Sequence, residues 1–494
     1  MKLSSLLLAL KLNQNADFPD IDIESIVSDS RQANPSCLFV CIPGSRADGH
    51  RFVGEAVKKG ALVIVCEKPV NVPEHILQIQ VSSSKEALSI LMQQWTDYAW
   101  KKMQMIAVTG TTAKTTIAFL VYRMLNLLEK PCAFIGTAGL YSQDEEMNIL
   151  LQGPVTTPQP QELHPLLKQM HQNGCEAVSM EASSFGLAEK RLWGMQFDLA
   201  ILSNLSFNHH IGFHGSWEDY LSAKRILFQQ LKPEGIAILN SDDAYWEFFR
   251  KACSNVLCYG SSASAEVRIS DLDMDQPRGI RFNLHFNEQI FPIQSELQGF
   301  FQAWNIAAAF AVGVSLGYSP QKTLEALTHI SHIPGRWDEI YSNAPFKVIV
   351  DKANTPLALE SIRNLVLNPS YCHRVAVFGN VGGGDYLERV ELAKLLIAMF
   401  DHLVLTQDDP EDEDIWKNFD EFLSGLNSEQ KQKISIEPSR KAAFSIAVDK
   451  IQKNGLLLIL GRGNQKEFIC KGRATIFNDV IEIQKVLHEK GYLP

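Results

Sequence analysis

The stretch VTGTTAKTTIAFLVYRML, residues 108–125, decides the fold because it joins an apolar strand to a helix through a loop of Gly, Thr and Lys. A helix N-terminus offers unpaired N–H groups and a partial positive charge, and a lysine adds a full charge. The stretch therefore predicts a phosphate-binding loop at the head of a helix. The residues expected around the phosphates are Gly110, Thr111, Thr112, Ala113, Lys114, Thr115 and Thr116.

Ala113 departs from the pattern of such loops, which usually place a glycine before the lysine, and strict Walker spacing is not met. Glycine suits this place because it has no Cβ and tolerates positive φ. A methyl group there is expected to cost about 1 kcal/mol or more of strain if the residue has positive φ. The alternative interpretation is an ordinary strand-to-helix turn that holds no phosphate.

The bulk composition is that of a large globular protein. The chain has 494 residues, of which 46% are apolar and 21% charged, and this length suggests about three domains. A net charge of -10 argues against nucleic acid or an anionic membrane as a partner. Nine cysteines without a CxxC pair indicate reduced thiols, and MKLSSLLLALKLNQ is interpreted as a short amphipathic helix rather than a signal peptide. We expect a cytoplasmic monomer.

Strand-length apolar runs alternate with helical patterns along the whole chain, which predicts an α/β protein with parallel sheets. We expect three domains: 1–100, a central phosphate-loop domain at 101–335, and a Rossmann-like domain at 336–494. In the last domain the strands FKVIVD, RVAVFG, HLVLTQ and GLLLILG end in the polar loops KANTP, NVGGGD, DDPEDED and RGNQKE. Since ligands bind beyond the carboxyl ends of parallel strands, these four loops should lie near one another.

Two further stretches add groups suited to phosphate chemistry. Glu181 follows a strand in SMEASSF, where a carboxylate can hold Mg²⁺ beside a phosphate. His209, His210 and His214 crowd the loop SNLSFNHHIGFHG, and Lys224 follows it. For the histidines we keep three interpretations: a role beside the phosphate site, a solvated loop, and a zinc site, although no cysteine or carboxylate at metal-ligand spacing supports zinc.

The order of motifs resembles the Mur ligases over nearly the whole chain. The motifs are TGTxxKTT, TTP, MExSS, a histidine loop ending HG, AKxxLF, PGR, DxAxTP, FGxxGGxD, DDP and GxG, with DSRQANPSCLFVCIPGSRADGH resembling the uridine-binding domain. The members most similar add the third residue of the cell-wall stem peptide. The resemblance implies that ATP phosphorylates a carboxylate of a UDP-muramoyl dipeptide, and that the amine of a free amino acid displaces phosphate from the acyl phosphate.

The resemblance also implies roles for individual residues. Those implied in catalysis are Lys114, Lys224 and His209, and those implied in Mg²⁺ binding are Thr115, Glu181, His209 and Lys224 once carbamylated. Asn305, Arg336 and Asp351 would join the phosphate loop in binding ATP. The muramoyl substrate would contact Ser30, Thr156, Thr157, Ser183, Glu189 and Arg191, and the amino acid would contact Asp408, Asp409, Glu411, Gly461 and Gly463.

Several residues depart from the family pattern. They are Ala113 for glycine, Phe185 for a frequent histidine, Glu189 for an amide, Asn208 for aspartate, and Lys352 and Asn354 for the tyrosine and histidine of DYAHTP. In DDPEDED, Glu411 stands where members that add diaminopimelate usually carry an arginine that grips its distal carboxylate. An anionic pocket would suit a cationic side chain such as lysine or ornithine, whereas the alternative is a solvated acidic loop without substrate contact.

Three functions follow from these observations. The first is an ATP-dependent ligase that adds a third amino acid other than diaminopimelate to the UDP-muramoyl dipeptide. The second is a paralogous ligase with other substrates in specialised metabolism, which the many departures favour. The third is an inactive member that binds nucleotide or precursor in a regulatory role, although the shared retention of Lys114, Glu181 and Lys224 argues against it.

Overall fold

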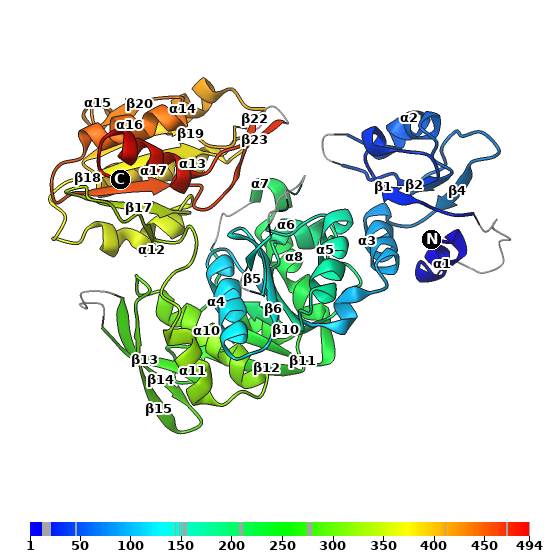
Figure 1. Ribbon diagram of the computed structural model, residues 1–494, viewed down its shortest axis with the longest axis horizontal. Coiled ribbons are helices and arrows are strands. Elements are labelled where there is room, and N and C mark those ends of the chain that lie inside the picture. Colours follow the sequence, from blue (N-terminus) through cyan, green and yellow to red (C-terminus); the bar gives the residue numbers. More distant parts are fainter. Residues whose placement is uncertain are drawn as a thin grey trace.

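The protein is described by a computed structural model, and its elements form three lobes along the chain (Figure 1). The structure describes residues 1–11, 21–44, 47–143, 145–147, 149, 151, 156–206, 211–273, 279–410, 412–470 and 473–493, without the side chains of residues 211, 212, 473 and 474. Mixed α/β structure with parallel sheets runs through all three lobes, as the sequence predicts.

The N-terminal lobe is built on a four-stranded sheet in the order β1-β2-β3-β4, with all neighbours parallel. Its elements are α1 (Leu3–Ala9), β1 (Ser25–Val27), β2 (Cys37–Val40), α2 (Val53–Lys58), β3 (Val63–Cys66), β4 (Leu77–Gln80) and α3 (Ser84–Trp95). Helices α1 and α3 pack on one face of the sheet and α2 on the other, so β2 and β3 are buried throughout. Helix α1 confirms the helix predicted at the N-terminus.

The central lobe contains an 11-stranded sheet in the order β15-β14-β13-β12-β11-β10-β5-β9-β6-β7-β8. Its strands are β5 (Gln104–Thr109), β6 (Cys132–Gly136), β7 (Gly139–Ser142), β8 (Glu145–Glu146), β9 (Ala177–Glu181), β10 (Phe197–Leu202), β11 (Leu231–Asn240), β12 (Asn255–Gly260), β13 (Val267–Asp273), β14 (Ile280–Phe286) and β15 (Gln289–Ser295). The seven central strands, in the order β13-β12-β11-β10-β5-β9-β6, are parallel to one another. Strands β14 and β15 at one edge and β7 and β8 at the other pair in antiparallel fashion.

Helices cover both faces of this central sheet. They are α4 (Lys114–Leu127), α5 (Pro160–Gln172), α6 (Ser184–Ala188), α7 (Ile211–His214), α8 (Trp217–Gln229), α9 (Trp246–Arg250), α10 (Gln302–Ser315) and α11 (Pro320–Thr328). One core joins α4, α10 and α11 to the sheet, and a second core joins α5 and α8 to the opposite face. Strand β5 lies between the two cores, which explains its continuous apolar sequence.

The C-terminal lobe holds a six-stranded sheet in the order β16-β17-β21-β18-β19-β20 and a separate hairpin, β22-β23. The strands are β16 (Asp338–Glu339), β17 (Lys347–Asp351), β18 (Arg374–Asn380), β19 (His402–Gln407), β20 (Ile434–Ile436), β21 (Leu456–Leu460), β22 (Glu467–Cys470) and β23 (Arg473–Ile476). The helices are α12 (Pro356–Val366), α13 (Tyr386–Met399), α14 (Ile415–Ser424), α15 (Ser428–Lys431), α16 (Arg440–Lys450) and α17 (Asp479–Glu489).

All four strands predicted for the C-terminal lobe are present, and the polar loops at their carboxyl ends meet. Arg462 after β21 contacts Asp408 and Asp409 after β19, while Lys352 after β17 donates to Gln465. The amide of Gly382, which follows β18, donates to the carbonyl of Asp409 at 2.8 Å. The prediction that these loops gather in one place is therefore confirmed. The domain boundaries at residues 100 and 335 stay predictions.

Helix α3 connects the N-terminal lobe to the central lobe (Figure 1). Gln93 on α3 donates to the carbonyl of Trp193 at 2.7 Å, and Lys85 at the start of the helix pairs with Glu189 at 2.9 Å. The two lobes are thus joined by hydrogen bonds from a buried helix face as well as by the chain itself. Among the residues that the structure describes, no helix combines the length and the apolar character needed to cross a bilayer.

The buried histidine of α5 leads to a testable prediction for stability. His164 is 1% exposed, neither ring nitrogen has a hydrogen-bond partner, and burial lowers its pKa to about 3. The unfolded chain binds a proton below about pH 6.5 that the folded protein does not take up, so stability falls with falling pH. Between pH 7.5 and 5.5 this loss amounts to about 1.4 kcal/mol.

A His164→Leu variant should lack this loss when the free energy of unfolding is measured by urea titration at both pH values. His171→Leu, a substitution at a half-buried position of the same helix, is the matched control. An equal fall in stability for wild type and His164→Leu would contradict the assignment of the effect to His164.

Candidate active site

The loop between β5 and α4 is held tightly against the end of β10. Gly110 has φ of 145°, and a Cβ placed on it would lie 1.9 Å from the hydroxyl oxygen of Ser203 and 2.9 Å from the carbonyl oxygen of Asn204. Any side chain at this position would therefore displace the loop. The amide of Thr111 donates to the carbonyl of Asn204 at 2.6 Å, and this bond holds the loop against the residues that follow β10.

Two residues that sequence reasoning missed position this loop. The side-chain oxygen of Asn204 accepts hydrogen bonds from both the amide and the hydroxyl of Thr112 at 3.0 Å. The hydroxyl groups of Tyr220 and Thr111 lie 2.8 Å apart. Their spacing in the sequence could have indicated them. Tyr220 precedes Lys224 by one helical turn, so both side chains lie on one helix face, and Asn204 follows the end of a predicted strand.

Ala113 adopts the left-handed conformation, with φ of 64° and ψ of -2°, directly before α4. The strain expected from the sequence if φ were positive is therefore present. A left-handed conformation costs about 1–2 kcal/mol for a residue with a Cβ. The alanine keeps the loop geometry for which glycine is the unstrained residue.

Two lysines converge on one backbone oxygen in this loop. Lys114 donates to the carbonyls of Gly110 and Thr111 at 3.0 and 2.9 Å, and Lys224 donates to the same Gly110 carbonyl at 2.6 Å. Lys224 is 1% exposed, and its ammonium lies 4.5 Å from the centre of the Tyr220 ring. Burial and the charge of Lys114 hold the pKa of Lys224 well below its usual value, so its neutral form is favoured. Burial also lowers the pKa of Lys114.

A buried carboxylate lies on the other side of the loop. Glu181 ends β9, and its Oε1 accepts from the amide of Thr137 at 2.6 Å. A Cβ on Gly136 would approach that oxygen to 2.4 Å, so the glycine makes room for the carboxylate. Among the described residues, the Oε2 atom has a single contact, with the Thr137 hydroxyl at 3.4 Å, and it can accept further bonds. His209 and His210 lie outside the described residues.

The C-terminal lobe reaches the same loop through an arginine. Arg336 donates to the hydroxyl of Thr115 at 2.7 Å, and Asn464 donates to the carbonyl of Ala138 at 3.0 Å. Asp351 accepts from the amides of Trp337 and Ala353 at 2.6 and 2.7 Å, which fixes the chain beside Arg336. These contacts bring Arg336 to the phosphate loop and the loop after β21 to the turn between β6 and β7.

Asn305 is placed differently from Arg336 and Asp351. It is buried within α10 and donates to the side chain of Gln302 at 2.9 Å, and none of the described hydrogen bonds joins it to the phosphate loop. Its predicted contact with the nucleotide therefore stays a prediction.

Most of the residues expected to contact the muramoyl substrate form one cluster beside Glu181. Thr157 donates to Ser183 at 3.1 Å, and Arg191 donates to the carbonyl of Thr157 at 2.6 Å. The hydroxyls of Thr156 and Thr137 lie 2.9 Å apart, which connects the cluster to Glu181. Burial lowers the pKa of Arg191 to about 10.

Glu189 and Ser30, the other two residues predicted to contact the muramoyl substrate, do not join this cluster. Glu189 forms the ion pair with Lys85 that joins the lobes, so its carboxylate is partly neutralised. Ser30, in the N-terminal lobe, donates to Glu55 at 2.7 Å. Each keeps oxygen lone pairs that can accept from a ligand.

The acidic stretch DDPEDED differs from the free anionic pocket expected from the sequence. Arg462 is fully buried and pairs with both Asp408 and Asp409, the latter at 2.6 Å. Glu413 pairs with the buried Arg389 at 2.6 Å. Asp414 caps α14 by accepting from the amide of Trp416. The two arginines and this cap compensate charges that the sequence left unpaired, while Glu411 lies outside the described residues.

Gly461 and Gly463 let these loops approach one another. A Cβ on Gly461 would lie 3.1 Å from Oδ2 of Asp408, and one on Gly463 would lie 2.7 Å from the carbonyl oxygen of Gly335. Both residues have positive φ, of 109° and 56°. Their lack of side chains therefore brings the loop after β21 against β17 and the PGR turn.

Family models match the chain in three places. They are described as the Mur ligase family catalytic domain at residues 22–96, the Mur ligase middle domain at 108–313, and the Mur ligase glutamate ligase domain at 335–463. A UDP-N-acetylmuramoyl-L-alanyl-D-glutamate–2,6-diaminopimelate ligase from Chlorobaculum tepidum is 32% identical over 95% of this chain and 94% of its own length. The chain belongs to the Mur ligase family.

Other relatives agree with this assignment. The protein of the same name from Solibacter usitatus is 30% identical over 100% of this chain and 99% of its own. A solved structure of a ligase with that name matches with a TM-score of 0.65 and 25% identity over 100% of both chains. This Mur ligase is therefore an ATP-dependent enzyme that forms amide bonds, and the resemblance inferred from its motifs is confirmed.

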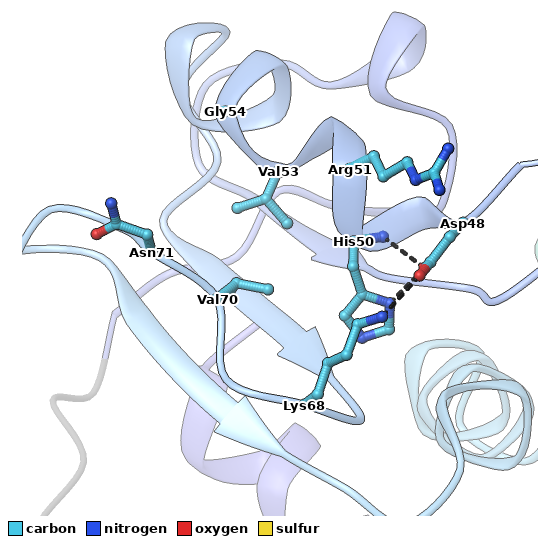
Figure 2. A pocket seen from close by; sticks show the side chains of 8 residues that line it. All are labelled: Asp48, His50, Arg51, Val53, Gly54, Lys68, Val70 and Asn71. Atoms are coloured by element: carbon cyan, nitrogen blue, oxygen red, sulfur yellow. Dashed lines mark hydrogen bonds and ion pairs between the residues drawn. The ribbon is translucent and has the colours of Figure 1, made fainter.

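The N-terminal lobe of this Mur ligase contains a separate pocket at the carboxyl ends of β2 and β3 (Figure 2). Asp48 accepts from the backbone amide and the imidazole of His50, at 3.0 and 2.6 Å, and pairs with Lys68 at 2.8 Å. The second ring nitrogen of His50 accepts from the amide of Glu67. These bonds order the loop that carries the ADGH motif.

The strain at Ala113 predicts effects of opposite sign on stability for two glycine substitutions, one directly before α4 and one inside it. Ala113→Gly should stabilise the folded protein by about 0.5–1 kcal/mol, because the left-handed conformation no longer carries a Cβ penalty. Its ATP-dependent turnover should equal or exceed that of wild type.

Ala118→Gly, in the interior of α4, should instead destabilise by about 1 kcal/mol. Urea unfolding and steady-state kinetics check both variants. A loss of stability in Ala113→Gly would show that the observed φ imposes no strain.

Proposed function

We propose that this Mur ligase adds a third amino acid to UDP-N-acetylmuramoyl-L-alanyl-D-glutamate in peptidoglycan precursor synthesis. The observation that carries the proposal is the convergence of Lys114 and Lys224 on Gly110, with Arg336 reaching Thr115 from the C-terminal lobe. Three basic side chains therefore surround one phosphate loop. The relatives named above act, by their names, on this dipeptide precursor and an amino acid.

The proposed reaction has two steps. A carboxylate oxygen of the dipeptide attacks the γ-phosphorus of ATP, forming the acyl phosphate and releasing ADP. The neutral amine of the amino acid then attacks the acyl carbon, so that a C–N bond forms, the C–O bond to phosphate breaks, and the amine loses a proton. Lys114 and Arg336 would neutralise the charge that develops on the phosphate oxygens.

The oxygen donors at this site suit Mg²⁺. The hydroxyl of Thr115 and the carboxylate of Glu181 are ligands of the type that Mg²⁺ prefers, and bound Mg²⁺ supplies charge neutralisation on the phosphates. Among the described residues, no group of three His, Cys, Asp or Glu side chains is placed to hold a metal ion. Thr115 and Glu181 would hold the ion, and His209 remains a predicted contributor outside the described residues.

Lys224 is proposed to be carbamylated. Its neutral amine would add to CO₂, forming an N–C bond and releasing a proton, which converts the side chain into an anion. The low pKa of Lys224, caused by burial and by Lys114, favours the neutral amine that this reaction requires. The negative carbamate would also relieve the repulsion between the two lysines and add an oxygen ligand for Mg²⁺.

The lobes divide the substrates in this proposal. Ser30 and the N-terminal lobe would bind the uridine end, and the cluster around Thr157, Ser183 and Arg191 would bind the muramoyl peptide. The bridge formed by Lys85 and Glu189 supports this arrangement because it holds the two subsites at a fixed separation. The incoming amino acid would enter at the loops after β19 and β21.

The amino acid is predicted to be other than diaminopimelate, with a cationic side chain. This prediction rests on Glu411, which replaces the arginine that binds the distal carboxylate of diaminopimelate in related ligases. The pairing of Asp408 and Asp409 with Arg462 weakens the argument from loop charge. The diaminopimelate ligases among the relatives make that amino acid the necessary comparison.

Phosphate release separates the three functions considered from the sequence. The protein is mixed with ATP, Mg²⁺, UDP-muramoyl-alanyl-glutamate and a panel containing lysine, ornithine, diaminopimelate and neutral amino acids. Turnover with lysine or ornithine is expected. Turnover with diaminopimelate alone would reject the prediction of a cationic amino acid. Turnover only with an acceptor other than the UDP-muramoyl dipeptide would favour the paralogous ligase. ATP binding without turnover would favour the inactive family member.

The carbamate gives a second test. Lys224→Ala should lose at least about 100-fold in turnover, because removal of a group that stabilises the transition state costs several kcal/mol. Bicarbonate should not restore it, whereas wild type depleted of CO₂ should regain activity with bicarbonate. Lys232→Ala, which removes a half-buried ion pair with Asp198 at the start of β11, is the control. Unchanged turnover in Lys224→Ala would reject the carbamate.

A further inference from the structure

Two phenylalanines on separate helices of the central lobe are partly exposed and in contact with each other. Phe185 lies on α6 and Phe213 on α7, and both helices lie next to α8 (Figure 1). The centres of the two rings are 4.3 Å apart. Phe185 is 39% and Phe213 is 43% exposed, although a large apolar ring normally gains free energy by burial. The exposed surface of this pair calls for a function.

One end of the pair adjoins the residues expected to hold the muramoyl substrate. The guanidinium carbon of Arg191 lies 4.9 Å from the centre of the Phe185 ring, and Arg191 donates to the carbonyl of Thr157. Ser183, which accepts from the Thr157 hydroxyl at 3.1 Å, precedes Phe185 by two residues. Phe185 therefore borders the substrate cluster.

The other end of the pair reaches the phosphate loop through two more rings. The ring centres of Phe213 and His214 are 4.8 Å apart, and those of His214 and Tyr220 are 5.4 Å apart. The Tyr220 hydroxyl lies 2.8 Å from that of Thr111, and Nζ of Lys224 lies 4.5 Å from the Tyr220 ring centre. Burial is the main cause that lowers the pKa of His214, which favours its neutral ring. A continuous row of uncharged rings thus joins the substrate cluster to the phosphate loop.

The proposed reaction passes between the two ends of this row. The acyl phosphate forms where the dipeptide carboxylate meets the γ-phosphate, and its acyl carbon is open to water as well as to the amine. If water attacks, a C–O bond forms, the C–O bond to phosphate breaks, and the water loses a proton. The dipeptide is then regenerated and ATP is hydrolysed without an amide bond. Exclusion of water from the site suppresses such a side reaction.

We propose that the Phe185–Phe213 pair excludes water from the acyl phosphate, so that the amine of the amino acid reacts with it instead. This inference rests on the proposed function and adds a determinant of how tightly ATP use is coupled to amide formation. Phe185 replaces a frequent histidine of the family pattern, and the phenyl ring lacks the nitrogens with which an imidazole binds water. The exposed surface of the two rings is the part that would face the intermediate.

The test measures the ratio of ADP released to amide formed, with the amino acid of the panel that gives the highest turnover. Wild type should form equal amounts of the two products. Phe185→Ala and Phe213→Ala should raise the ratio to about two or more, because loss of either ring admits water to the acyl phosphate. Phe185→Leu, which stays apolar, should keep the wild-type ratio. Because the ratio is taken within one variant, a general loss of activity cancels.

Phe248→Ala is the matched control, since the Phe248 ring on α9 also lies 4.9 Å from the guanidinium carbon of an arginine, Arg225. It should keep the wild-type ratio, and the KM for ATP should be unchanged in all these variants.

A wild-type ratio in both alanine variants would overturn the proposed shielding and leave the ligase function intact. If the KM for the dipeptide rose in those variants while the ratio stayed the same, the rings would be substrate contacts instead. Absence of amide with every amino acid in wild type would overturn the proposed function itself.

Discussion

The carbonyl oxygen of Gly110 organises the active site because two lysine side chains donate to it. Lys114 comes from the helix that follows the loop, and Lys224 comes from α8, so this single oxygen joins the two elements. The approach requires glycine, since a Cβ would overlap Ser203. Burial lowers the pKa of both lysines, and the charge of Lys114 lowers the pKa of Lys224 further, which favours the neutral amine of Lys224.

The C-terminal lobe completes this arrangement through backbone proximity. The backbones of Gly335 and Gly463 approach closely because neither residue has a side chain. This approach lets Arg336 reach Thr115 and places Lys352 beside Arg336. The carboxyl ends of parallel strands gather the other loops at the same edge. The site therefore depends on two close backbone approaches, one within the central lobe at Gly110 and one at the junction with the C-terminal lobe.

The charges of the acidic loop show where sequence reasoning stops. DDPEDED reads as a run of negative charge, but Arg462 and Arg389 are 54 and 24 residues distant in the chain from the acids that they bind, Asp408 and Glu413. No local pattern predicts such pairing, because a strand or helix fixes neighbours only within a few residues. The same reason explains why Asn204 and Tyr220 were missed, since both reach the phosphate loop from about 92 to 109 residues away.

The sequence by itself determined the alternation of strands and helices, the phosphate loop, and membership of the Mur ligases, because apolar periodicity and ordered motifs are local properties. It also indicated the strain at Ala113, which depends on a single residue in a known loop type. Only the tertiary structure decided which charges are compensated and which remain free. Among the described residues, Oδ2 of Asp408 has no donor because it is buried among groups contributed by other strands, and burial of a charge depends on everything packed around it.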